Sequence, residues 1–153
     1  MAFALLGGCG DGSGGGGAGG SVSSQPLAGT INGKPWTFVA GQTDAFLSKS
    51  SDTYFADLYD QALDTACGSP PSGANRQLIL NIPKTVGHYT LSLNLNQTFS
   101  YNDDKGDAQN DIAVSGQLDV TSITATKIQG GVNMAQGSGN SVNGQFEITI
   151  CDQ

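Results

Sequence analysis

Side chains that could hold a metal ion concentrate in residues 102–111, which read Asn-Asp-Asp-Lys-Gly-Asp-Ala-Gln-Asn-Asp. Calcium takes about six to eight hard oxygen ligands, and a loop containing Gly106 can wrap around such an ion. The spacing departs from that of an EF-hand loop and Lys105 interrupts the carboxylates, so a solvated polar turn is the favoured interpretation and calcium binding the alternative. We predict no cofactor, with calcium as the one ion left open. Its expected ligands are Asp103, Asp104, Asp107 and Asp111.

Candidates for catalysis are few and form no recognisable constellation. His88 is the single histidine, which excludes a zinc centre built on several histidines. The chain has no Gly-x-Ser-x-Gly elbow, and its glycine run at residues 14–17 does not join a strand to a helix as a phosphate-binding loop does. No spacing places two aspartates across a cleft for glycoside hydrolysis. We therefore predict no catalytic residue and no enzymatic activity, and we expect His88 at the surface.

Composition restricts the partners. The formal net charge is −7, the isoelectric point is near 4.2, and six basic residues are present. Binding of nucleic acid requires a basic patch, so this partner is excluded. Charged residues make up 12% of the chain, which leaves a surface of Asn, Gln, Ser and Thr that suits an extracellular β domain.

The first nine residues resemble the end of a bacterial lipoprotein signal. A short apolar run leads into Leu6-Gly7-Gly8-Cys9, in which small residues admit the backbone to a peptidase groove before Cys9 is lipidated. The basic and longer apolar regions of a signal are missing, so we expect that the natural start lies further upstream or that the chain was trimmed. The alternative is an accidental apolar terminus with a free cysteine. Residues 10–25 are a Gly/Ser tract, predicted to be a disordered tether, and residues 26–153 form the single domain.

Lipidation of Cys9 would leave two further cysteines, Cys67 and Cys151. An exported protein lies in an oxidising compartment, so we expect these two to form a disulfide. Two buried free thiols are the alternative. A redox role is disfavoured because no C-x-x-C spacing occurs.

The elements that must position these side chains are best seen in the C-terminal third. Residues 115–121 and 143–149 share the phrase Gly-Gln followed by alternating apolar and polar residues. This period places Leu118 and Val120, like Phe146 and Ile148, on one face of an extended chain. Residues 128–134 alternate in the same way, so three strands of a meander are predicted.

Further strands precede the meander. Asn32-Gly33 marks a tight hairpin turn between residues 27–31 and 35–40, and Trp36 is expected in the core. Residues 52–59 read as a strand that runs into a helical turn through residue 66. The other predicted strands cover residues 76–82, 87–96 with leucines 91, 93 and 95 inward, and 98–101. About 8–10 strands in all predict an all-β antiparallel sandwich or barrel.

The order of these signals resembles that of small bacterial lipoproteins with a single β-rich domain of unknown function. It runs from the lipobox cysteine and tether through residues 29–36, Cys67, and residues 86–90 and 114–118 to residues 142–151. The resemblance implies an envelope-anchored β domain and supplies no catalytic residues.

Three functional hypotheses follow. The first is a non-enzymatic lipoprotein of the outer membrane or cell surface, attached to the membrane through its lipid, whose domain is a structural or binding module for an envelope protein or glycan. The second is a small β-barrel carrier of an apolar or glycan ligand. A hydrolase is the third.

Overall fold

The computed structural model describes residues 20–151, which form β structure with one short helix. The elements in chain order are β1 (Ala28–Ile31), β2 (Lys34–Thr37), β3 (Ala40–Thr43), α1 (Ala45–Lys49), β4 (Thr53–Tyr59), β5 (Arg76–Pro83), β6 (Gly87–Thr90), β7 (Gln97–Asn102), β8 (Ala108–Ala113), β9 (Gly116–Ile123), β10 (Lys127–Gln136) and β11 (Asn140–Thr149). The predicted all-β class is confirmed. Within the described chain, no helix is long and apolar enough to cross a membrane.

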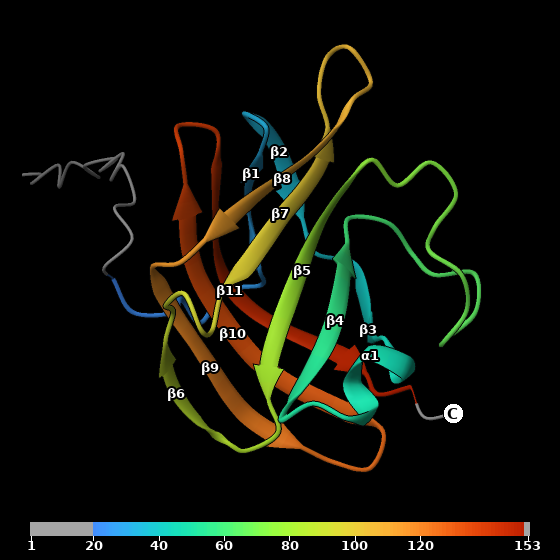
Figure 1. Cartoon of the computed structure of the whole chain (residues 1–153), viewed down its shortest axis with the longest axis vertical. Coiled ribbons are helices and arrows are strands. Elements are labelled where there is room, and N and C mark those ends of the chain that lie inside the picture. The colour runs from blue at the N-terminus through green and yellow to red at the C-terminus, as the bar shows by residue number, and fades with distance from the viewer. Residues whose placement is uncertain (1–19, 152–153) are drawn as a thin grey trace, which may run out of the picture.

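The strands form one curled sheet (Figure 1). Its main path runs β6-β9-β10-β11-β3-β4-β5-β7-β8, and the β1–β2 hairpin joins it through β11. Pairing is antiparallel except at the junction of β11 with β3, where Thr149 pairs with Gln42 in parallel. Strands β6 and β8 are therefore the open edges of the path.

The predicted C-terminal meander is confirmed as β9-β10-β11. Its inward residues are buried, with Leu118 fully inaccessible and Ile148 only 2% exposed. Gly130 allows β9 and β10 to approach closely, since a Cβ atom there would lie 2.3 Å from the Asp119 carbonyl oxygen. The alternation of apolar and polar residues therefore places one face of these strands in the core.

The hairpin predicted from Asn32-Gly33 is also confirmed. Both residues adopt positive φ, 53° and 68°, as a tight turn between twisted strands requires. Trp36 is 2% exposed and packs in the core as expected. The interior of the curled sheet is filled by aliphatic and aromatic side chains, including Leu27, Ile31, Trp36, Leu58, Leu78, Leu80, Ile82, Phe99, Leu118, Val120, Ile128, Val132 and Met134.

Two of the predicted elements are wrong. The strand predicted at residues 87–96 ends at Thr90, and Leu93 is 80% exposed. Ser92 and Leu95 exchange backbone hydrogen bonds, so a tight turn replaces the strand. The helical turn expected after Tyr59 is absent, because residues 60–75 form a loop between β4 and β5.

The sequence analysis missed helix α1. Asp44 caps it by accepting a hydrogen bond from the Leu47 backbone N–H at 2.7 Å. Phe46 and Leu47 are exposed, so the helix lacks the apolar stripe by which a helix is usually detected.

Residues 20–25, assigned to the tether from composition, lie along the face of β10 and β11 opposite the core. The Asn133 amide donates to the Gly20 carbonyl at 2.5 Å, and the Gln145 amide donates to the Ser23 carbonyl at 2.7 Å. The Ser23 N–H in turn donates to the Asn143 side chain at 2.7 Å. The ordered domain thus begins before Pro26. Cys9 lies outside the described residues.

Candidate functional site

Three hairpin turns meet at one end of the sheet: β1–β2, β7–β8 and β10–β11 (Figure 1). The Gly33 N–H donates to the Gly139 carbonyl at 2.9 Å, which joins the first turn to the third. The Lys34 ammonium group lies 3.1 Å from the Asp104 carboxylate in the second turn. We call this region the hairpin end.

The hairpin end contains an open cavity of about 390 Å³. This volume lies within the range of about 300–1,000 Å³ that is common for ligand pockets. Two turns and strands β7 and β8 contribute to it, so residues far apart in the sequence share one space. Its lining residues are Asn32, Gly33, Tyr101, Asp111, Gln136, Gly137, Ser138, Gly139 and Asn140.

A hydrogen-bond network fixes the polar groups of this cavity. Asn140 is 4% exposed; its side-chain oxygen accepts from the Asn32 backbone N–H at 2.7 Å, and its amide nitrogen donates to Asp111 Oδ2 at 2.6 Å. The Tyr101 hydroxyl donates to the same Asp111 oxygen at 2.8 Å. Asn140 is thus the link between all three chain segments. Groups held in this way lose little freedom when a ligand binds.

The Tyr101 hydroxyl carries its proton in the hydrogen bond to Asp111. This hydrogen bond raises the pKa of Tyr101 above its ordinary value, with smaller contributions from burial and from the charge of Asp111. A phenol whose proton is engaged in this way acts as a hydrogen-bond donor and as an apolar surface. It is not a base at neutral pH.

The four aspartates proposed as calcium ligands have different surroundings. The predicted acidic loop is shorter than expected, because β8 begins at Ala108 and places Asp111 on a strand, in the cavity. Asp103 caps its own turn: its carboxylate accepts from the N–H groups of Lys105 and Asp107 at 2.9 and 3.0 Å. These bonds hold the pKa of Asp103 below its ordinary value.

Residues 20–151 contain no group of three or more His, Cys, Asp or Glu side chains placed to hold a metal. Calcium binding at these residues stays a hypothesis drawn from the sequence.

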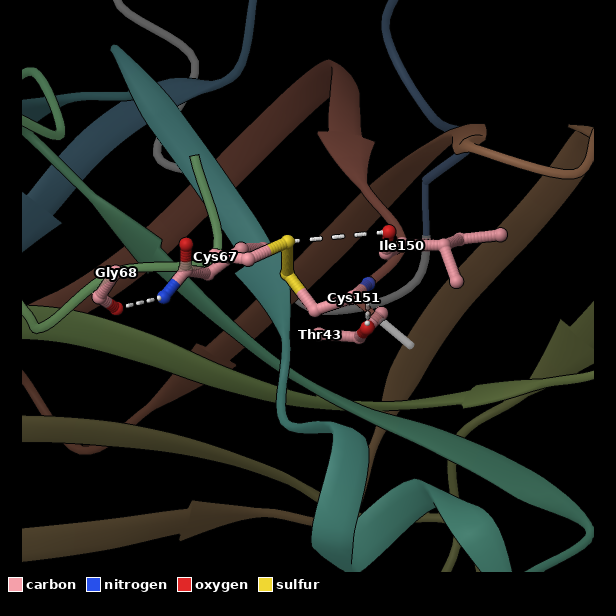
Figure 2. The surroundings of a disulfide bond; sticks show 6 residues. Thr43, Cys67, Gly68, Ile150 and Cys151 are labelled. Carbon is pink, nitrogen blue, oxygen red and sulfur yellow. Dashed lines mark hydrogen bonds between the residues drawn. A yellow bond between two sulfur atoms is a disulfide. The ribbon is translucent and has the colours of Figure 1, made fainter. Parts of the chain in front are cut away.

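The disulfide predicted from the sequence is present in the structure. Cys67 and Cys151 form a disulfide across a sequence separation of 84 residues (Figure 2). The Gly68 carbonyl accepts from the Gln42 side chain at 2.8 Å, and the Cys151 N–H donates to the Thr43 hydroxyl at 2.8 Å. The loop after β4 and the end of β11 are thereby fastened to β3.

A partly buried carboxyl group lies close to the disulfide region, on β4. Asp57 on β4 stands opposite Gln42 on β3. Burial, together with the charge of Asp44, raises the pKa of Asp57 to about 6. Burial and the charge of Asp57 likewise raise the pKa of Tyr59 to about 12. Asp57 therefore changes charge in the weakly acidic range, which makes it a candidate determinant of pH-dependent stability.

His88 is exposed, as predicted, with 80% of its side chain accessible. Its Nδ1 atom lies 2.8 Å from Asp119 Oδ1, and the Gln117 amide donates to the same oxygen at 2.8 Å. The Asp119 side chain is only 15% exposed, but His88 is open to solvent, and a pair screened on one side in this way contributes little to stability.

Comparison of the chain with protein-family models, curated proteins and solved structures gives no match. The function of the chain is therefore inferred from the geometry of the hairpin end. Sequence reasoning singled out Asp111 for a different reason and missed Asn32, Tyr101 and Asn140. The glycine-rich stretch at residues 137–140 was the available signal, since such stretches mark exposed turns.

Proposed function

We propose that the chain is a bacterial cell-envelope lipoprotein whose β domain is a non-catalytic binding module. Cys9 carries the lipid, at the outer membrane or the cell surface, and the Gly-rich segment that follows links it to the domain. The observation that carries the binding role is the cavity at the hairpin end, where Asn140 presets the hydrogen-bonding groups.

Binding at the surface is favoured over carriage of an apolar ligand inside the sheet. The interior is occupied by the protein's own side chains, among them Trp36, Phe99 and Met134, each at most 2% exposed. A carrier needs interior volume that its own side chains leave free. A polar surface cavity instead suits a partner that is recognised through hydrogen bonds.

In-cell photo-crosslinking tests the binding role. A diazirine side chain replaces Gln136 on the cavity rim, and the matched control carries the same group at Ala125 in the β9–β10 turn, at the other end of the sheet. We expect a discrete cross-linked envelope component from position 136 alone, lost in an added Asp111→Asn change. Equal labelling at both positions, or none at either, would overturn the binding role.

A further inference from the structure

We propose that the cavity at the hairpin end binds a neutral glycan, with Asp111 accepting from one hydroxyl group of a sugar ring and polar groups on the cavity rim hydrogen-bonding its neighbour. This inference rests on the proposed binding module and names its ligand class. The side chains of Asp111, Tyr101 and Asn140 are already held in place by their mutual hydrogen bonds.

Asp111 retains the capacity to accept further hydrogen bonds. Both hydrogen bonds that the described chain makes to its carboxylate, from Tyr101 and Asn140, end on Oδ2. A carboxylate has two oxygens with about four lone-pair sites, so Oδ1 can accept from a ligand hydroxyl. The position of the carboxylate is set by its two partners and needs no rearrangement.

The rim of the cavity supplies the complementary donors. The Asn140 amide is buried and already engaged with Asp111 and Tyr101, so its role is to hold the Asp111 carboxylate in place. An acceptor on Asp111 beside polar groups on the rim matches a pair of hydroxyl groups that each donate and accept. Gln136 and Ser138 on the rim add further groups of both kinds.

The charge of the cavity selects against anions. Among residues 20–151, its lining includes one carboxylate and no lysine or arginine, and the whole chain carries −7. The negative charge of Asp111 would repel phosphates and uronic acids, and the cavity offers no cation to pair with them. The ring of Tyr101 supplies the apolar surface on which the carbon face of a sugar can rest. A neutral ligand rich in hydroxyl groups fits these features together.

The test is a titration of the full-length protein by NMR with neutral oligosaccharides: maltopentaose, cellopentaose and mannopentaose. Uronic-acid oligosaccharides serve as the charged comparison. We expect at least one neutral probe to bind with a dissociation constant of about 0.1–1 mM, typical of a small open site. The shifted resonances should belong to Asn140 and the Gly137–Gly139 turn.

Two aspartate variants separate the site from a general charge effect. Asp111→Asn should weaken binding at least tenfold, since a charge-assisted hydrogen bond is lost. Asp104→Asn removes the same charge at the same end of the molecule but outside the cavity, and it should change affinity less than twofold. Equal effects of the two variants, or preferred binding of the uronic acids, would overturn the inference.

A third variant guards against misfolding of the first. Ser138 is an exposed turn residue on the rim, so Ser138→Trp should block the cavity without touching the hydrogen-bond network. We expect loss of binding with an unchanged Tm. If no neutral probe binds while the group at position 136 still captures an envelope protein, the glycan inference is wrong and the binding module stands. If both experiments are negative, both proposals are wrong.

Discussion

Asn140 donates a hydrogen bond to Asp111 at 2.6 Å and thereby joins β11, in the middle of the strand order, to β8 at its edge. Four strands separate these two along the sheet. The curl of the sheet brings them together, and side chains make the connection where backbone pairing is absent. The cavity is therefore a product of the curl of the sheet.

Replacement of Asn140 by Ala should lower the free energy of unfolding by about 1–3 kcal/mol, because the Asn32 N–H and the Asp111 carboxylate each lose a partner. Urea denaturation measures the change. The matched control is Asn110→Ala on the exposed side of β8, expected within about 0.5 kcal/mol of the parent. Equal effects at both positions would show that the network does not stabilise the fold.

Reduction of the Cys67–Cys151 disulfide should lower the free energy of unfolding by about 4–5 kcal/mol. The reason is that the bond closes a loop over 84 residues and so restricts the unfolded chain. Denaturation with and without reductant checks this. The variant in which Cys67 and Cys151 are both replaced by Ser should have the stability of the reduced protein, and reductant should not change it. An unchanged midpoint on reduction would contradict a bridging role.

The pH dependence of stability should follow Asp57, whose pKa is raised to about 6 by burial. The unfolded carboxyl titrates near pH 3.9, so the folded state binds more protons between about pH 4 and 6, and stability falls as pH rises through this window. Asp57→Asn should abolish this dependence of stability on pH. It should also raise the free energy of unfolding at pH 7 by about 1–2 kcal/mol, after allowance for partial solvent screening. Denaturation series at several pH values measure this. Asp64→Asn, at an exposed loop position, should retain the slope; a slope that persists in Asp57→Asn would exclude this group as its source.

Millimolar calcium should leave the Tm equal to its value in EDTA. The Asp103 carboxylate is already engaged by backbone N–H groups, and Asp104 pairs with Lys34. Binding an ion would require these contacts to break. A rise in Tm with calcium that Asp103→Asn removes would instead support the site proposed from the sequence.

The alternation of apolar and polar residues was enough to predict the meander, because each of its strands has one face buried in the core. The same pattern misled at residues 91–96, where leucines alternate with polar residues but Ser92 and Leu95 close a turn. Sequence alternation reports which faces can be buried and carries no information on turn hydrogen bonds that end a strand.

The cavity was beyond the reach of sequence reasoning for a different reason. Asn32, Tyr101, Asp111 and Asn140 come from three hairpins, and each residue is unremarkable in its own segment. Their proximity depends on strand order and curl, which follow from the packing of the whole core. Asp111 was grouped with its sequence neighbours, whereas its partners are Tyr101 across the β7–β8 hairpin and Asn140 across the curled sheet.

Intact mass of the protein, purified from the membranes of the bacterium that naturally produces it, checks the lipid anchor and the disulfide in one measurement. We expect a chain that begins at Cys9, carries a lipid, and gains two hydrogens only when the Cys67–Cys151 bond is reduced. An unmodified chain starting at Met1 with two free thiols would contradict the envelope location, the disulfide and the proposed function together.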